Sequence, residues 1–185
     1  MIPQRLFRSY HRDMVQQHLK RLQGQDRRLR FGAMIPDEAI DEYVSKSWDT
    51  NNVWFGIIEE DEVIAAVHVA QDSDNRAELG LSVDDNWRGH KLGQALFERA
   101  VIALKARNIR DVFMHCLSEN TIIKHIARKN EMVMVSEYGE TDADLHLSPS
   151  TPIDPITNVL VEQLALYDSA VRNTSTAWRK MYALD

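Results

Sequence analysis

Val-Asp-Asp-Asn-Trp-Arg-Gly-His-Lys-Leu-Gly-Gln-Ala-Leu-Phe, residues 83–97, is the stretch that organises this chain. An apolar, strand-like run, residues 77–83, leads into it, and a helix-like run, residues 91–107, follows. The turn between them, residues 88–93, carries two glycines and three side chains that can be cationic. A strand that turns into a helix leaves backbone N–H groups unpaired at the positive end of the helix dipole. The stretch therefore predicts either a site for a phosphate-bearing ligand or only a tight connection.

Two common phosphate-binding patterns do not match this turn. A P-loop needs Gly-Lys-Ser/Thr, and the dinucleotide fingerprint needs three spaced glycines. The stretch instead resembles motif A of the GNAT family of N-acetyltransferases, in which a strand ending in Val is followed by Arg/Gln-x-x-Gly-x-Gly/Ala at the start of a helix. Arg88 takes the first place and Gly93 the last, whereas Lys91 stands where the family usually has its middle glycine. We expect Lys91 to keep ordinary dihedral angles there and still donate its N–H.

A second segment, residues 120–132, resembles the family's Asn-x-x-Ala-x-x-Leu-Tyr-x-x-x-Gly-Phe motif. Asn120 falls on the Asn, whereas Ala127 replaces the Tyr. The family's Asn lies beside the coenzyme A arm, so the resemblance implies the same place for Asn120. The family's Tyr protonates the departing thiolate in many members. An alkyl thiol has a pKa of ~8.5, so a thiolate can leave without that acid.

The resemblance covers about residues 1–148 and implies a mixed α/β fold. Its central sheet is mostly antiparallel, its fourth and fifth strands splay apart, and helices flank it. Residue patterns predict helices over 13–22, 37–46, 91–107 and a segment opening at 118–121, with a basic loop over 25–32. They predict strands over 5–10, 53–58, 63–70, 77–83, 112–117, 132–136 and 144–147. His115 and Cys116, on the strand 112–117, are expected to be packed interior positions.

Three prolines, Pro149, Pro152 and Pro155, mark a boundary between a domain of residues 1–148 and an extension of residues 149–185. Within the extension, one long helix is predicted from Asp154 to about Tyr182. An apolar stripe along it can face its own domain. Alternatively, the helix projects and pairs with a second subunit, which makes a homodimer the competing hypothesis.

Composition narrows the class of protein. The net charge of −6 argues against general nucleic-acid binding. Cys116 is the single cysteine, so no intramolecular disulfide can form and a cytoplasmic location is expected. No apolar run approaches the ~20 residues that span a bilayer, and no membrane partner is expected. The seven histidines show no metal-ligand spacing, so no metal is expected.

The resemblance implies acetyl-CoA as co-substrate. Backbone amides of the turn would face its pyrophosphate, with added charge from Arg88 and Lys91. Its amide-rich pantetheine arm would pair with the exposed edge of the strand that ends at Ser82 and Val83. The predicted coenzyme-binding residues are Leu81, Ser82, Val83, Arg88, Gly89, His90, Lys91, Leu92, Gly93 and Asn120.

The attacking amine must be neutral, so a base is needed. Glu78 is the candidate, because burial in an apolar strand would raise its pKa and some family members have a Glu at a similar position. The alternative for Glu78 is an outward-facing charge. Arg27, Arg30 and Phe31 in the segment 25–32 are candidates for holding a carboxylate or an aromatic acceptor, because in the family this segment commonly lines the acceptor site. The alternative is a solvated connection.

The reaction that the resemblance implies is N-acetylation of a primary amine, on a small molecule or a protein, by direct attack in a ternary complex. Two other classes stay open. One is an acyl-CoA-binding regulatory module without turnover, which the missing motif tyrosine favours. The other is an interaction protein whose long C-terminal helix is the working part.

Overall fold

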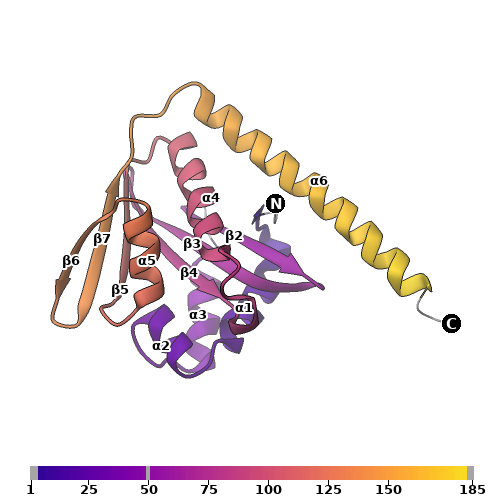
Figure 1. The fold of residues 1–185 in the computed structure, drawn as a ribbon, viewed down its shortest axis with the longest axis horizontal. Coiled ribbons are helices and arrows are strands. Elements are labelled where there is room, and N and C mark those ends of the chain that lie inside the picture. Colours follow the sequence, from indigo (N-terminus) through magenta and orange to yellow (C-terminus); the bar gives the residue numbers. More distant parts are fainter. Residues whose placement is uncertain (1–3, 49–50, 183–185) are drawn as a thin grey trace.

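The computed structural model describes residues 4–48 and 51–182. Its centre is a seven-stranded sheet in the order β1-β2-β3-β4-β5-β7-β6 (Figure 1). All strand pairs in it are antiparallel except β4 with β5. The strands are β1 (Arg5–Leu6), β2 (Asn52–Glu59), β3 (Glu62–Ser73), β4 (Arg76–Val83), β5 (Asp111–Leu117), β6 (Val133–Glu137) and β7 (Glu140–His146). The first strand is much shorter than the predicted 5–10, because a 3-10 turn, Ser9–His11, begins two residues after its end.

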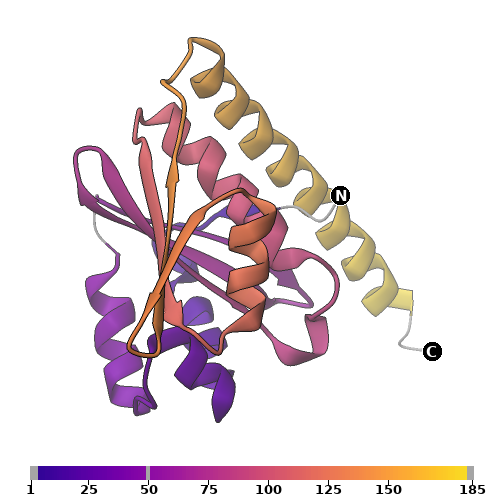
Figure 2. The same ribbon diagram turned by 60° about the vertical axis from the view of Figure 1, so that its left-hand side comes forward.

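Helices cover both faces of the sheet (Figures 1 and 2). They are α1 (Arg12–Arg21), α2 (Gln25–Phe31), α3 (Asp37–Lys46), α4 (Leu92–Ala106), α5 (Thr121–Lys129) and α6 (Ile153–Tyr182). The apolar residues of β2 to β5 that face α4 and α5 form one buried cluster. A second cluster lies on the opposite face, between the sheet and the helices α1 and α3. The sheet is therefore the middle layer of three, which accounts for the continuous burial of β2 and β3.

The segment 25–32 is not the predicted loop but the helix α2. Gly24 and Gly32 flank it with backbone φ angles of 49° and 77°. Left-handed φ angles are readily adopted by glycine, so these residues let the chain enter and leave a helix of two turns sharply. The sequence pattern placed Gly32 in the loop, whereas it ends α2.

The parallel pair β4 and β5 separates along its length. Register pairs join Arg76 to Asp111, Ala77 to Val112 and Glu78 to Phe113, and pairing stops there. β5 stays paired with β7 over its whole length, so it turns away from β4 with its other neighbour. Residues 79–83 of β4 therefore have a free edge, and the expected splayed strand pair is confirmed.

The long helix α6 folds back along the outside of α4 (Figure 1). Arg99 of α4 donates a hydrogen bond to Asn158 at 2.8 Å, and Arg8 forms an ion pair with Glu162 at 3.1 Å. The other side of α6 leaves apolar residues exposed, namely Ile153, Ile156, Val159, Leu160, Leu164, Leu166 and Tyr167. Among the described residues, no helix combines the length and apolar character needed to cross a membrane.

Candidate functional site

A cavity of about 650 Å³ opens where β4 and β5 separate. One wall is the free edge of β4, another is the turn that leads into α4, a third is α5, and α2 lies across them. The coenzyme-binding residues predicted from sequence all line this cavity except His90. The ring of His90 turns back instead, with Nδ1 3.0 Å from the carbonyl oxygen of Arg88. The structure therefore gathers residues from three separate elements around one space.

The turn has an unusual backbone at two positions. Gly89 has a φ of 78° and Lys91, the N-cap of α4, has a φ of 61°. The expectation that Lys91 keeps ordinary dihedral angles is therefore wrong. A side chain in the left-handed region costs roughly 1–2 kcal/mol, which a glycine at that place avoids. The backbone nevertheless takes the course that a glycine would allow. The first N–H groups of α4, which have no partners within the helix, belong to residues that line the cavity.

The cations of the turn differ in their pairing. Arg88 forms ion pairs with Asp26 of α2 at 2.6 Å and with Asp85 at 3.1 Å. Its charge is therefore already balanced by carboxylates at the mouth of the cavity. Lys91 lines the same mouth, and no carboxylate of the described residues forms an ion pair with it. Lys91 is thus the better-placed cation for an anionic ligand.

Asn120 fastens two walls together. Its Oδ1 accepts a hydrogen bond from the backbone N–H of Ile123 at 3.1 Å, which caps α5. Its Nδ2 donates to the carbonyl oxygen of Leu29 in α2 at 3.3 Å. Arg28 and Gln25 of α2 add contacts to Glu119, just before α5. These contacts hold α2 in place across the cavity.

Glu78 lies at the closed end of the split, where β4 and β5 are still paired. It is half-buried and lines a small hollow that shares residues Leu29, Arg30, Leu81 and Ile123 with the main cavity. Glu78 does not line the main cavity itself. It therefore lies beyond the coenzyme-binding residues, at the innermost part of the split.

His115 and Cys116 line the same hollow. Cys116 is buried as expected, and burial raises the pKa of its thiol. The side chain of His115, however, is 40% exposed, and its Nδ1 lies 2.7 Å from Asp142 Oδ1 on β7. The hydrogen bond to Asp142 raises the pKa of His115, and the charge of Glu78 adds to the effect. The interior position predicted for His115 is therefore wrong, because sequence could not show that Asp142 is its cross-strand partner.

Arg30 crosses the space above Gly80 on β4. A Cβ atom on Gly80 would lie 2.5 Å from Arg30 Nη2, so the side chain needs the glycine beneath it. Arg30 donates to the hydroxyl of Tyr43 at 2.8 Å, and Tyr43 contacts His68 Nδ1 at 2.7 Å. These contacts fix a guanidinium at the border between the cavity and the small hollow.

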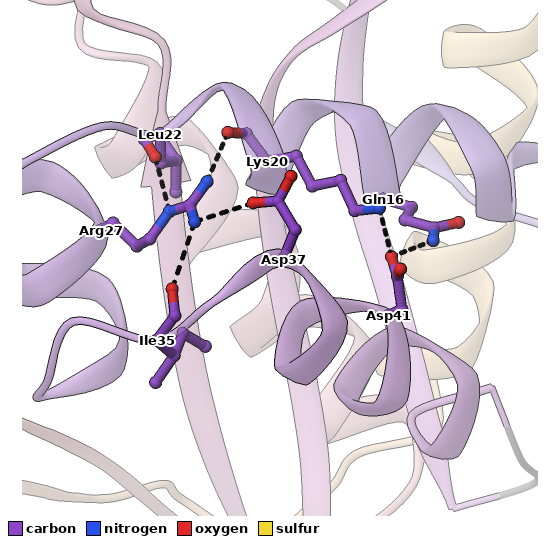
Figure 3. Close-up of polar contacts among 7 residues, drawn as sticks. All are labelled: Gln16, Lys20, Leu22, Arg27, Ile35, Asp37 and Asp41. Atoms are coloured by element: carbon purple, nitrogen blue, oxygen red, sulfur yellow. Dashed lines mark hydrogen bonds and ion pairs between the residues drawn. The ribbon is translucent and has the colours of Figure 1, made fainter.

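Arg27 has a different place, as Figure 3 shows. Its guanidinium donates to the carbonyl oxygens of Leu22, Ile35 and Lys20, and forms an ion pair with Asp37 at 2.8 Å. It joins the loop after α1 to α3 and lines neither cavity. Phe31 also lies outside both, packed against Tyr43 with ring centroids 5.6 Å apart. The structure therefore brings neither Arg27 nor Phe31 to the main cavity or the small hollow, because both are held in contacts within the scaffold.

No group of three or more His, Cys, Asp or Glu side chains within residues 4–48 and 51–182 is arranged to hold a metal ion.

A contact that sequence reasoning missed joins His18 of α1 to Ser82 of β4, with His18 Nε2 2.8 Å from Ser82 Oγ. The helical pattern placed His18 on a buried face, and a buried imidazole needs polar partners. Their identity depends on the fold.

Comparison with known proteins agrees with this geometry. The model of the Acetyltransferase (GNAT) family matches residues 19–130. No curated protein matches the chain. The GNAT domain of Streptomyces lividans PAT is similar in structure, with a TM-score of 0.68 and 16% identity over 78% of this chain and 89% of that one.

Two further solved structures contain the coenzyme. Campylobacter jejuni N-acetyltransferase PseH in complex with acetyl coenzyme A has a TM-score of 0.56 and 15% identity, over 80% of this chain and 100% of that one. The Thermoplasma acidophilum PaiA N-acetyltransferase in complex with coenzyme A has a TM-score of 0.61 and 12% identity, over 80% and 99%. At these identities the structural likeness supports the fold.

Proposed function

This protein belongs to the GNAT family of acetyltransferases, and we propose that it transfers the acetyl group of acetyl-CoA to a primary amine by direct attack in a ternary complex. One observation carries the proposal. The free edge of β4 and the turn with unpaired N–H groups open into the same cavity. The turn suits a pyrophosphate, and the strand edge suits a chain of amides that pairs as an added strand. Coenzyme A carries both groups in that order.

The proposed chemistry takes place at the innermost part of the split. The thioester would lie there, beside Glu78 and His115. Glu78 accepts a proton from the amine, whose nitrogen then attacks the thioester carbon. The nitrogen then loses its second proton to solvent, the carbon–sulfur bond breaks and the thiolate leaves. His115, whose pKa is raised, is the group in this hollow that can supply a proton to that thiolate.

The acceptor proposed here is an amine that carries a carboxylate. Arg30 is fixed at the border of the main cavity and the small hollow, whereas the guanidinium of Arg27 is bound within the scaffold. A guanidinium binds a carboxylate with paired donors, and Glu78 would attract the ammonium form of the same molecule. The substitution Gly80→Ala tests this role, because its Cβ displaces only the end of the Arg30 side chain. It should raise KM for a carboxylate-bearing amine by a larger factor than KM for an amine without a carboxylate.

A homodimer that forms through α6 is a second proposal. The exposed apolar residues of its outer side support it, because large exposed apolar patches mark interaction surfaces. Light scattering on the purified chain tests it, and a monomer at micromolar concentration would contradict it. A cytoplasmic location likewise stays a prediction.

Calorimetric titration with acetyl-CoA, followed by measurement of thiol release with amines, tests the main proposal. The amines are free amino acids, polyamines and lysine peptides. Binding with thiol release that depends on the amine supports acetyl transfer. Binding without release from any amine would favour a regulatory module, and no binding by the folded protein would favour an interaction protein.

A further inference from the structure

Three side chains from α1 and the end of β4 form a continuous polar chain beside the cavity. Ser82 Oγ lies 2.8 Å from His18 Nε2, and His18 Nδ1 lies 2.8 Å from Asp84 Oδ1. The imidazole is completely buried, with 0% of its side chain exposed. Ser82 lines the cavity, so it is the end of the chain that a ligand can reach. The order of the groups is that of a Ser-His-Asp triad.

The partners of Asp84 determine where the protons lie. Arg21 Nη2 donates to Asp84 Oδ2 at 3.0 Å, while Oδ1 faces His18. Burial alone would raise the pKa of Asp84, but the contacts with His18 and Arg21 outweigh it and hold that pKa below its usual range. An ionised carboxylate can only accept hydrogen bonds, so in a neutral ring the proton of His18 lies on Nδ1, the nitrogen nearest Asp84. Nε2 is then an acceptor, and the Ser82 hydroxyl donates to it.

With the ring in that form, the hydroxyl proton of Ser82 points toward His18 Nε2, and the oxygen lone pairs are left for a ligand. A partner for that oxygen must be a hydrogen-bond donor. The apolar residues near it, such as Leu81 and Val83, offer no competing donor from their side chains. The chain thus presents one oriented acceptor on the wall of the split.

Position along β4 decides between a nucleophile and a binding group. The split closes at Glu78, and Ser82 lies four residues beyond it, about 13 Å along a strand at ~3.3 Å per residue. If the pyrophosphate lies at the turn, the thioester at the far end of the pantetheine arm lies toward Glu78. Ser82 then faces the middle of the arm, where its amides are, and not the reacting carbon.

We propose that the ring of His18 is neutral, that Ser82 accepts a hydrogen bond from an amide N–H of the pantetheine arm, and that His18 and Asp84 are positioning residues that keep the Ser82 hydroxyl in this orientation. The inference rests on the proposed function, because the arm enters the cavity only if acetyl-CoA binds there. It assigns to this chain a side-chain contact in addition to the strand-edge pairing.

The test compares acetyl-CoA with analogues in which an ester oxygen replaces the N–H of one or the other pantetheine amide. Calorimetry measures Kd for each ligand with the wild-type chain and with Ser82→Ala. One neutral hydrogen bond is worth roughly 0.5–1.5 kcal/mol, so at one of the amides the wild type should lose about 3- to 10-fold on ester replacement. In Ser82→Ala that loss should disappear. An equal loss in both proteins at both amides would overturn the proposal.

Asp84→Asn is the matched second variant, because it keeps the shape of the side chain at residue 84 and reverses the direction of the hydrogen bonds that lead through His18 to Ser82. Arg21 needs an oxygen opposite it, so the new amide turns its NH₂ toward His18 Nδ1. Nε2 must then carry the ring proton and donate to Ser82, which turns the hydroxyl proton into the cavity. The preference for the amide over the ester should fall in this variant, although Ser82 is intact. An unchanged preference would contradict the role of the chain.

Ser82→Cys provides a further check if Ser82→Ala does not fold, because a thiol of similar shape is a weak acceptor and should lose the preference too. Mass spectrometry of the wild-type chain after incubation with acetyl-CoA alone tests the triad as a nucleophile. An acetyl group on Ser82 would overturn the binding role. Failure of the wild type to bind acetyl-CoA would defeat the proposed function as well, whereas binding without an amide preference defeats only this inference.

Discussion

Lys91 is the residue at which the backbone and the charge of the turn can be tested separately. Its φ of 61° is left-handed, and its ammonium lines the mouth of the cavity. The substitutions Lys91→Ala and Lys91→Gly both remove the charge. Only glycine also removes the left-handed strain of roughly 1–2 kcal/mol. The greater freedom of glycine in the unfolded chain offsets about 0.4–1 kcal/mol of that gain.

The glycine variant should therefore unfold with a free energy about 0.5–1 kcal/mol higher than the alanine variant, from the difference of these two terms. For a chain of this size, each kcal/mol of added stability raises Tm by about 2–4 °C. Urea and thermal denaturation measure it. At a position with helical dihedral angles, alanine would instead be the more stable by ~1 kcal/mol. The sign of the stability difference between the two variants therefore tests the left-handed conformation of Lys91. A more stable alanine variant would refute that conformation.

The same pair of variants reports on the ligand. Both should bind acetyl-CoA more weakly than the wild type, by a similar factor, because both lack the ammonium. The difference from the wild type should shrink as salt is added, since the contact is between exposed charges. Equal affinity of all three proteins would mean that Lys91 does not reach the phosphates.

Three other variants have outcomes that the structure predicts. Glu78→Gln should lower kcat by about 10²- to 10⁴-fold, as expected for loss of a general base, and leave acetyl-CoA binding unchanged. Steady-state kinetics and calorimetry measure the two quantities. A change in Kd would mean that Glu78 only shapes the pocket. Arg27→Met should lower the free energy of unfolding by about 1.5–3 kcal/mol in urea titrations, because it removes charged hydrogen bonds of the scaffold, and KM for the acceptor should not change. Asp142→Asn should lower the pKa of His115 in an NMR titration. Because the folded-state pKa of His115 is raised, the contribution of His115 to stability is complete below the unfolded value of 6.5 and is lost as pH rises through the folded value. Asp142→Asn should therefore flatten the pH–stability curve in that range. An unchanged curve would show that the pair of His115 and Asp142 contributes nothing to stability.

The sequence was sufficient for the elements that carry a regular pattern. The apolar stripe of α4 and the continuous apolar runs of β2 and β3 reflect their burial, which the sequence pattern reveals. The short helix α2 was missed because it buries none of its residues, so no periodicity marks it. Its two flanking glycines serve equally well in a loop and at helix boundaries.

Roles that depend on distant partners could not be predicted. Arg27 and Arg30 lie three residues apart in one basic stretch, and only the fold directs one to the scaffold and the other toward Gly80. His115 pairs with Asp142 through the register of β5 with β7. Similarly, His18 lies 64 residues from Ser82 in the chain, and their contact exists only because α1 packs against β3, the neighbour of β4 in the sheet.

Amide hydrogen exchange of residues 79–83, with and without acetyl-CoA, tests the central claim most directly. These residues have a free edge because the pairing of β4 with β5 ends at Glu78. If the pantetheine arm pairs with that edge, acetyl-CoA should slow the exchange of the edge amides strongly, together with those at the start of α4. A saturating concentration of acetyl-CoA that leaves exchange in both segments unchanged would contradict the account.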